Sequence, residues 1–169
     1  MRNLALLLIA LLLVWENCVV WAADANLGES AAAAKLEASR CVLDYAERDG
    51  IKTVVGVVIG RAMIDKMPLV AALKRVETFR FNGYGTGGKD LRDSMFVHLQ
   101  DATYLHTLDI PGARISGHGL RYLEGLPKLT VLILANAELD NAGLADLQNM
   151  EQVETLDLSF TDVSSDGLL

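Results

Sequence analysis

The most suggestive spacing for chemistry lies in residues 83–90, which nearly spell the phosphate-binding loop G-x-x-x-x-G-K-[ST]. Gly83, Gly88 and Lys89 match, and the stretch lies between an extended-looking run and an amphipathic one, as that loop requires. Asp90, however, stands where Ser or Thr would hold magnesium, and its charge would repel phosphate. We therefore interpret the stretch as a loop whose glycines permit tight turns, and we predict no nucleotide and no other cofactor.

Three histidines are the conventional catalytic bases of the chain besides its carboxylates. Their places in the repeating pattern of the sequence put His98, His106 and His118 on different edges, so we do not expect a metal site or a triad. The sequence has no H-E-x-x-H, G-x-S-x-G or cysteine-based zinc spacing. We predict no catalytic and no metal-binding residue; a hydrolase acting through a histidine or on a nucleotide is the enzyme alternative. Four aspartates suit solvated turns and caps: Asp140, Asp146, Asp162 and Asp166.

Residues 1–22 have the layout of a secretory signal peptide. Arg2 precedes an apolar run, and small residues suited to a signal peptidase follow it. We expect cleavage near Ala23 or Asn26. The sequence therefore predicts a secreted protein, or one of the periplasm or cell envelope.

The alternative is an uncleaved membrane anchor through residues 4–23, although Glu16 would be costly at that depth. The membrane is a predicted partner only in that case. The whole chain of 169 residues carries a net charge of −7, so we predict no nucleic-acid partner, because the sequence offers no basic patch to neutralise phosphates. Cleavage would leave Cys41 as the one cysteine, either a buried small hydrophobe, which we favour, or a lone thiol.

Internal repetition organises the second half of the chain. Copies with a period of 24 residues begin at Leu105, Leu129 and Val153. Counting each first residue as zero, apolar side chains recur at offsets 3, 5, 10, 15, 18 and 21. In the first copy these are Leu108, Ile110, Ile115, Leu120, Leu123 and Leu126. In the second they are Leu132, Leu134, Leu139, Leu144, Leu147 and Met150, and in the third Leu156, Leu158, Val163 and Leu168.

This spacing resembles the leucine-rich repeat pattern L-x-x-L-x-L-x-x-N/C-x-L, matched at Leu105, Leu108, Ile110 and Ile115 and again in each later copy. A small residue replaces the family's Asn or Cys, which is similar to a bacterial variant and closest to it over residues 156–168. The resemblance implies an α/β solenoid with short parallel strands on a concave side and helical or 3-10 turns on a convex side. The replacing residues are Ala113, Ala137 and Thr161.

The same elements follow from the residues themselves. Offsets 3 and 5 alternate, which places both side chains on one face of a short strand. Offsets 15, 18 and 21 step by three, which suits a helical or 3-10 turn packed against that strand. A unit of about six such side chains gains roughly 2 kcal/mol from each, against roughly 1 to 2 kcal/mol of backbone entropy per residue. Neighbouring units must therefore cover both faces of each one.

Looser copies precede these, and residues 30–48 are predicted to form a helix stopped by Gly50. We expect this N-terminal helix, within residues 23–50, to cap the first repeat. No cap is expected at the other end, so the chain is a fragment, or further repeats or a partner cover that end. The predicted repeat region, residues 51–169, divides into 54–75, 76–104, 105–128, 129–152 and an incomplete 153–169, with 83–90 as an insertion.

Offsets 2, 4 and 6 point away from the core onto the concave sheet, the surface on which such solenoids bind. Val131 and Ile133 are notable there, because a solvated strand face has little reason to carry both. With charged neighbours they predict a protein-docking surface with a polar rim, and incidental β-propensity is the alternative. The predicted contact residues are Arg80, Asn82, Thr107, Asp109, Val131, Ile133, Thr155 and Asp157.

The sequence as a whole thus predicts a non-catalytic, protein-binding module of an exported leucine-rich repeat protein. The alternative is a truncated sensor or recognition segment of a larger membrane-anchored or repeat protein.

Overall fold

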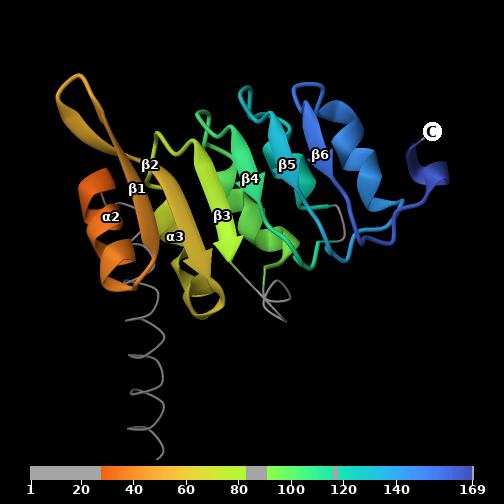
Figure 1. Ribbon diagram of the computed structural model, residues 1–169, viewed down its shortest axis with the longest axis horizontal. Helices are drawn as coiled ribbons and strands as arrows, with labels where there is room; N and C mark the ends of the chain where they lie inside the picture. Colours follow the sequence, from red (N-terminus) through yellow and green to blue (C-terminus); the bar gives the residue numbers. More distant parts are fainter. Residues whose placement is uncertain (1–27, 83–90, 116–117, 169) are drawn as a thin grey trace, which may run out of the picture.

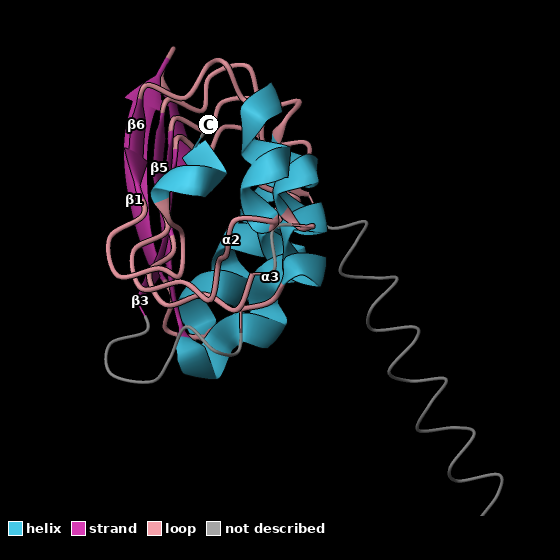
Figure 2. Ribbon diagram, turned by 90° about the vertical axis from the view of Figure 1, so that its right-hand side faces the viewer, coloured by secondary structure: helices cyan, strands magenta, loops and turns pink. Residues whose placement is uncertain are grey.

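The structure is a computed structural model that describes residues 28–82, 91–115 and 118–168, and these form an α/β fold of two layers (Figure 1). Figure 2 shows the strands in one layer and the helices in a second layer on one side of the sheet. The strands are β1 (Val42–Arg48), β2 (Ile51–Gly60), β3 (Thr78–Asn82), β4 (Thr107–Asp109), β5 (Val131–Ile133) and β6 (Thr155–Asp157). The helices are α2 (Glu29–Ala38) and α3 (Met67–Val70), with the 3-10 helices η1 (Arg61–Lys66), η3 (Asp93–Leu99), η4 (Leu120–Leu123), η5 (Gly143–Asn149) and η6 (Ser165–Leu168).

The six strands lie side by side in chain order, β1 to β6. Strands β2 to β6 are parallel, and each is in register with the next. Leu108 is paired with Leu132, which is paired with Leu156, so the steps from β4 to β5 and from β5 to β6 each advance the chain by the 24 residues of the sequence period. The strands that were predicted from offsets 3 and 5 are therefore confirmed.

The helix predicted over residues 30–48 is correct only as far as Ala38. Residues 42–48 instead form β1, which pairs antiparallel with β2 through a turn at Asp49 and Gly50. Both turn residues have positive φ, 54° and 74°, as Asp-Gly hairpin turns require. The alanine-rich start favoured a helix, but pairing with the long β-branched run of β2 decides the conformation of residues 42–48.

The core lies between the sheet and the helices, and α2 contributes to it at the β1 end. Ala32 and Leu36 of α2 are fully buried, and α2 contacts α3 and β1. The predicted repeat positions form the bulk of this core. Leu108 and Leu132 are fully buried, whereas Leu156 at the same position of the last unit is 41% exposed. The turns that follow the strands are 3-10 helices, as their spacing by three predicted.

Two predictions fall outside the described residues: the signal peptide at 1–22 and the inserted loop at 83–90. Within the described ranges, no helix combines the length and the apolar character needed to cross a membrane.

Candidate functional site

The face of the sheet that carries no helix, called here the open face, brings the predicted contact residues together. Within the described part of the chain the helices lie on the other side of the sheet (Figure 2). Side chains alternate between the two faces of a strand, so the residues between the core leucines must point to the open face. One row across the paired strands is Thr78, Thr107, Val131 and Thr155, and the next is Val58, Arg80, Asp109, Ile133 and Asp157, with Asn82 at the end of β3.

An ion pair between Arg80 and Asp109 lies on the open face. The Nε of Arg80 donates to Oδ2 of Asp109 at 2.8 Å, across neighbouring strands. The Arg80 side chain is 53% exposed and that of Asp109 only 18%. Such an exposed pair stabilises the fold by at most about 1 kcal/mol, so its main effect is to hold the guanidinium in one orientation on the open face.

Strand β5 differs from both of its neighbours. Strands β4 and β6 each read Thr-Leu-Asp, whereas β5 reads Val-Leu-Ile. The central leucines face the core, so the two substituted positions, Val131 and Ile133, face outward. Both side chains are half-buried among their row neighbours. The result is an apolar strip one strand wide between two strands that carry Thr and Asp.

Asp157 supplies the charge on the far side of that strip. Hydrogen bonds from Ser159, first from its hydroxyl and then from its backbone N–H, lower the pKa of the Asp157 carboxyl. The Ser159 amide lies 2.9 Å from Oδ1 of Asp157. The carboxylate is therefore charged at neutral pH and is held in place by the turn that follows β6.

The open face also extends over β1 and β2, which the sequence prediction missed because it assigned β1 to a helix. Val42 pairs with Val58, and Val42 is 59% exposed. Asp44 pairs with Gly56, where an added Cβ would lie 2.6 Å from Oδ2 and 2.9 Å from Cβ of Asp44, so a larger residue would displace the Asp44 side chain. The Asp49-Gly50 turn signal directly before the β-branched run of residues 51–59 could have revealed this hairpin.

The three histidines, which were not expected to form a site, lie in different environments. His98 lies half-buried in η3, and this burial lowers its pKa. His106 and His118 are exposed. No three His, Cys, Asp or Glu side chains among the described residues are arranged to hold a metal ion. Cys41 is buried, as predicted, and burial raises the pKa of its thiol.

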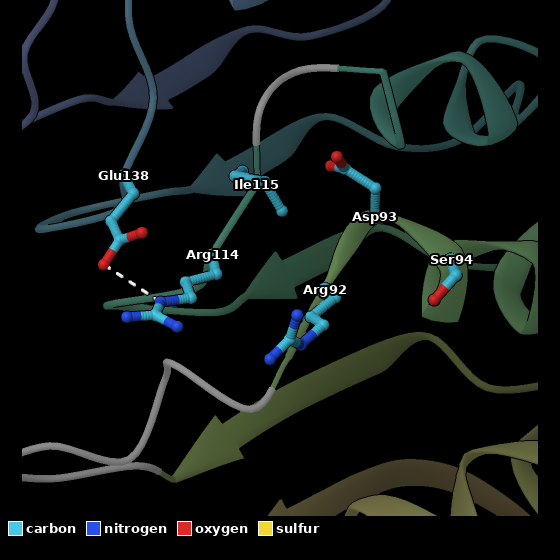
Figure 3. Close-up of a pocket in the computed structure, with 6 residues that line it drawn as sticks. All are labelled: Arg92, Asp93, Ser94, Arg114, Ile115 and Glu138. Carbon is cyan, nitrogen blue, oxygen red and sulfur yellow. Dashed lines mark hydrogen bonds and ion pairs between the residues drawn. The ribbon is translucent and has the colours of Figure 1, made fainter.

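A pocket lies away from the open face, lined by the six residues that Figure 3 labels. This open pocket of about 450 Å³ has Arg92 and Arg114 on one side, and the Arg114 Nε donates to Oε1 of Glu138 at 3.1 Å. The pocket balances its two guanidinium groups with the carboxylates of Asp93 and Glu138. This balance of charge gives it no strong preference for an anion, so the open face remains the better candidate.

Comparison with known proteins adds no assignment. Searches against protein-family models and against curated proteins found no match for this chain.

Proposed function

We propose that this chain is a leucine-rich repeat solenoid of an exported protein, and that it binds a protein partner through the open face. The repeat assignment is supported by the register of β4, β5 and β6, where residues 24 apart pair directly. It is also supported by full burial of the apolar side chains at offsets 3 and 5 in two successive units, Leu108, Ile110, Leu132 and Leu134. The same arrangement continues backwards to β2, where Val57 pairs with Phe79.

The single observation that carries the binding function is the Val131–Ile133 strip. Two neighbouring strands with the same central leucine use Thr and Asp at the matching positions, so the strand geometry itself does not require apolar side chains. Desolvating an apolar side chain of this size gains roughly 1.5 to 3 kcal/mol when burial is complete. Arg80, Asp109 and Asp157 flank the strip and suit the polar rim of a protein interface.

The proposed role is non-catalytic. Two charged groups on the open face are fixed by neighbouring side chains or turns: Arg80 by Asp109, and Asp157 by Ser159. These contacts orient charges for recognition. Export through residues 1–22 would place this face where extracellular or envelope proteins are the available partners.

The test is a change of β5 to the sequence of its neighbours, V131T/I133D, in the whole chain. The Thr-Leu-Asp sequence already forms a strand on both sides, so the backbone should tolerate it. I133D places a third carboxylate between Asp109 and Asp157, which costs some stability; circular dichroism and thermal melting check that the fold survives. The matched control is A145D/Q148D, which adds negative charge at two exposed positions of η5 in the same unit.

Proteins captured from the exported fraction are then compared by quantitative mass spectrometry. The proposal expects a partner that the native chain and the A145D/Q148D control both retain and that V131T/I133D loses by tenfold or more, about 1.4 kcal/mol of binding free energy. A partner retained equally by all three chains would place binding elsewhere and overturn the proposal.

A further inference from the structure

The open face carries a second apolar patch over β1 and β2. Val42 and Val58 are directly paired there, and both point to the open face because their neighbours Leu43 and Val57 pack in the core. Val42 is 59% exposed, and Val58 is half-buried. This pair, called here the β1–β2 patch, is apolar surface on the same side of the sheet as the Val131–Ile133 strip.

A carboxylate is placed beside the β1–β2 patch. Asp44 follows Val42 by two residues in the same strand and therefore shares its face. The carboxylate of Asp44 occupies the space that a side chain at its partner Gly56 would fill. Asp44 is exposed, and within the described ranges no hydrogen bond or ion pair engages its side chain, since the Nε of Arg80 donates to Asp109. A cation from outside the sheet can therefore reach this carboxylate.

The β1–β2 patch and the Val131–Ile133 strip lie on either side of one ion pair. Val58, Arg80, Asp109 and Ile133 are successive partners across β2, β3, β4 and β5, which Figure 1 shows side by side. Three strand spacings of about 4.8 Å separate Val58 from Ile133, which is roughly 14 Å. A single elongated element of a partner can therefore contact both apolar areas.

A helix suits this span better than an extended segment. Strands β3 and β4 beneath the span already pair with a strand on each side. An extended segment lying across them would find no partners for its own amides and carbonyls, whereas a helix satisfies these groups internally. Helix positions i, i+7 and i+11 share one face, and their separations of about 10.5 and 16.5 Å bracket the span.

Charge indicates a basic helix. The two outward-facing rows of β1 to β6 contain three aspartates and one arginine, which are Asp44, Asp109, Asp157 and Arg80. An acidic helix, or the same face of a second copy, would bring like charges together. A Lys or Arg that reaches Asp44 would also cover the β1–β2 patch with its methylene groups.

We propose that the partner binds the open face through a basic amphipathic helix that lies across the strands. A Lys or Arg of this helix pairs with Asp44, and its stem packs on Val42 and Val58. Apolar side chains at i+7 and i+11 from that residue pack on the Val131–Ile133 strip. This inference rests on the proposed function, that the open face binds a protein, and it adds the element of the partner that docks and its direction across the sheet.

Synthetic helical peptides test this in the whole chain. The Lys peptide consists of Ala and Gln with one Lys, and with Leu at i+7 and i+11 from that Lys. The Glu peptide has Glu in place of the Lys. A shifted peptide has the composition of the Lys peptide, but both Leu are moved by two residues, which rotates them by about 200° to the opposite face of the helix. Amide NMR titration measures each affinity and locates each peptide.

The expected result is a reversal of charge preference. The native chain binds the Lys peptide at least about fivefold more tightly than the Glu peptide, which is the contribution of one exposed ion pair. D44R reverses this order, and G56A reduces the preference because it displaces the Asp44 side chain without removing its charge. The matched control D101N removes an exposed aspartate on the turn after η3 and leaves the preference unchanged.

The apolar contacts have readouts of their own. The shifted peptide binds more weakly than the Lys peptide, and V42T/V58T, which keeps β-branched side chains in both strands, weakens binding of the Lys peptide. Amide shifts with the Lys peptide appear both at residues 42–44 and 56–58 and at residues 131–133. Circular dichroism checks that every variant keeps its fold.

Four outcomes would overturn the inference. They are a preference for the Lys peptide that persists in D44R, equal binding of the shifted peptide, no amide shifts at millimolar peptide, and shifts of the open face that follow protein concentration without any peptide. The last would assign the face to a second copy of this chain. Failure of the proposed function is distinguishable, because V131T/I133D would then leave the affinity of the Lys peptide unchanged. Failure of this inference alone would leave V131T/I133D weakening the binding while D44R did not alter the preference.

Discussion

Three leucines occupy the same repeat position in neighbouring strands but differ in burial, so alanine variants at these sites can measure how burial affects stability. Leu108, Leu132 and Leu156 are directly paired in neighbouring strands and face the same side of the sheet. Leu108 and Leu132 are 0% exposed, whereas Leu156 is 41% exposed. Replacing each with alanine therefore changes the same side chain in the same backbone, and exposure is the main difference between the sites.

The magnitudes follow from that exposure. L132A removes a buried side chain and leaves a cavity, so its expected cost is about 3 to 4 kcal/mol, as is that of L108A. L156A loses about half of a transfer free energy of roughly 2 kcal/mol, and solvent fills the space. We expect L156A to cost about 1 kcal/mol. The three values should therefore fall into two clearly separated groups.

Urea denaturation followed by circular dichroism measures these costs, with the m-value checked for each variant. The native chain and a surface variant, Q148A in η5, provide the reference. An L156A cost equal to that of L132A would mean that the β6 end is covered in solution. An L132A cost near 1 kcal/mol would mean that the core between the sheet and the 3-10 helices is not packed as described.

Three further predictions concern single residues. F160N should stabilise the chain by about 1 kcal/mol in urea melts, because Phe160 has φ 60° and is 90% exposed at the turn position that Asn136 occupies with φ 57° one repeat earlier; a loss of stability would refute this. G119A should cost about 1 to 3 kcal/mol, since its Cβ would lie 2.7 Å from Cα of Asp93, while G125A, which meets nothing within 4 Å, serves as the neutral control. Stability should fall as pH drops below 6.5, because burial lowers the pKa of His98 in the folded state and the unfolded chain takes up the proton first; an equal slope in H98Q would show that other groups cause it.

The repeating part of the fold was predictable because its signal is redundant. The same apolar offsets recur in each 24-residue unit, so a core position that is ambiguous in one unit can be assigned from the next. Leu120 and Leu123 were placed on a turn of period three, and they lie in η4 fully buried. Because strand alternation fixes direction, the outward positions of β4 and β5 followed from the inward ones.

The N-terminal part has no such repetition, and there the local apolar spacing wrongly predicted a helix through residue 48. Leu36, Leu43 and Ala46 share a face of an ideal helix, but Leu43 lies in β1 opposite Val57. A seven-residue strand is decided by its partner, which sequence spacing does not encode. The Arg80–Asp109 ion pair was likewise not predicted, although both residues were among the predicted contact residues. An ion pair depends on side-chain rotamers, which the spacing of a repeat does not fix.

The central claim, that the open face binds a protein, is tested most directly by photo-crosslinking. A photoreactive phenylalanine is placed at Ile133 on the open face, and at Ala145 on η5 as the control, in the whole chain exposed to the exported fraction. The account predicts a discrete crosslinked product from position 133 that is absent from position 145 and is competed away by excess native chain but not by V131T/I133D. Equal crosslinking from both positions, or a product at 145 alone, would contradict it.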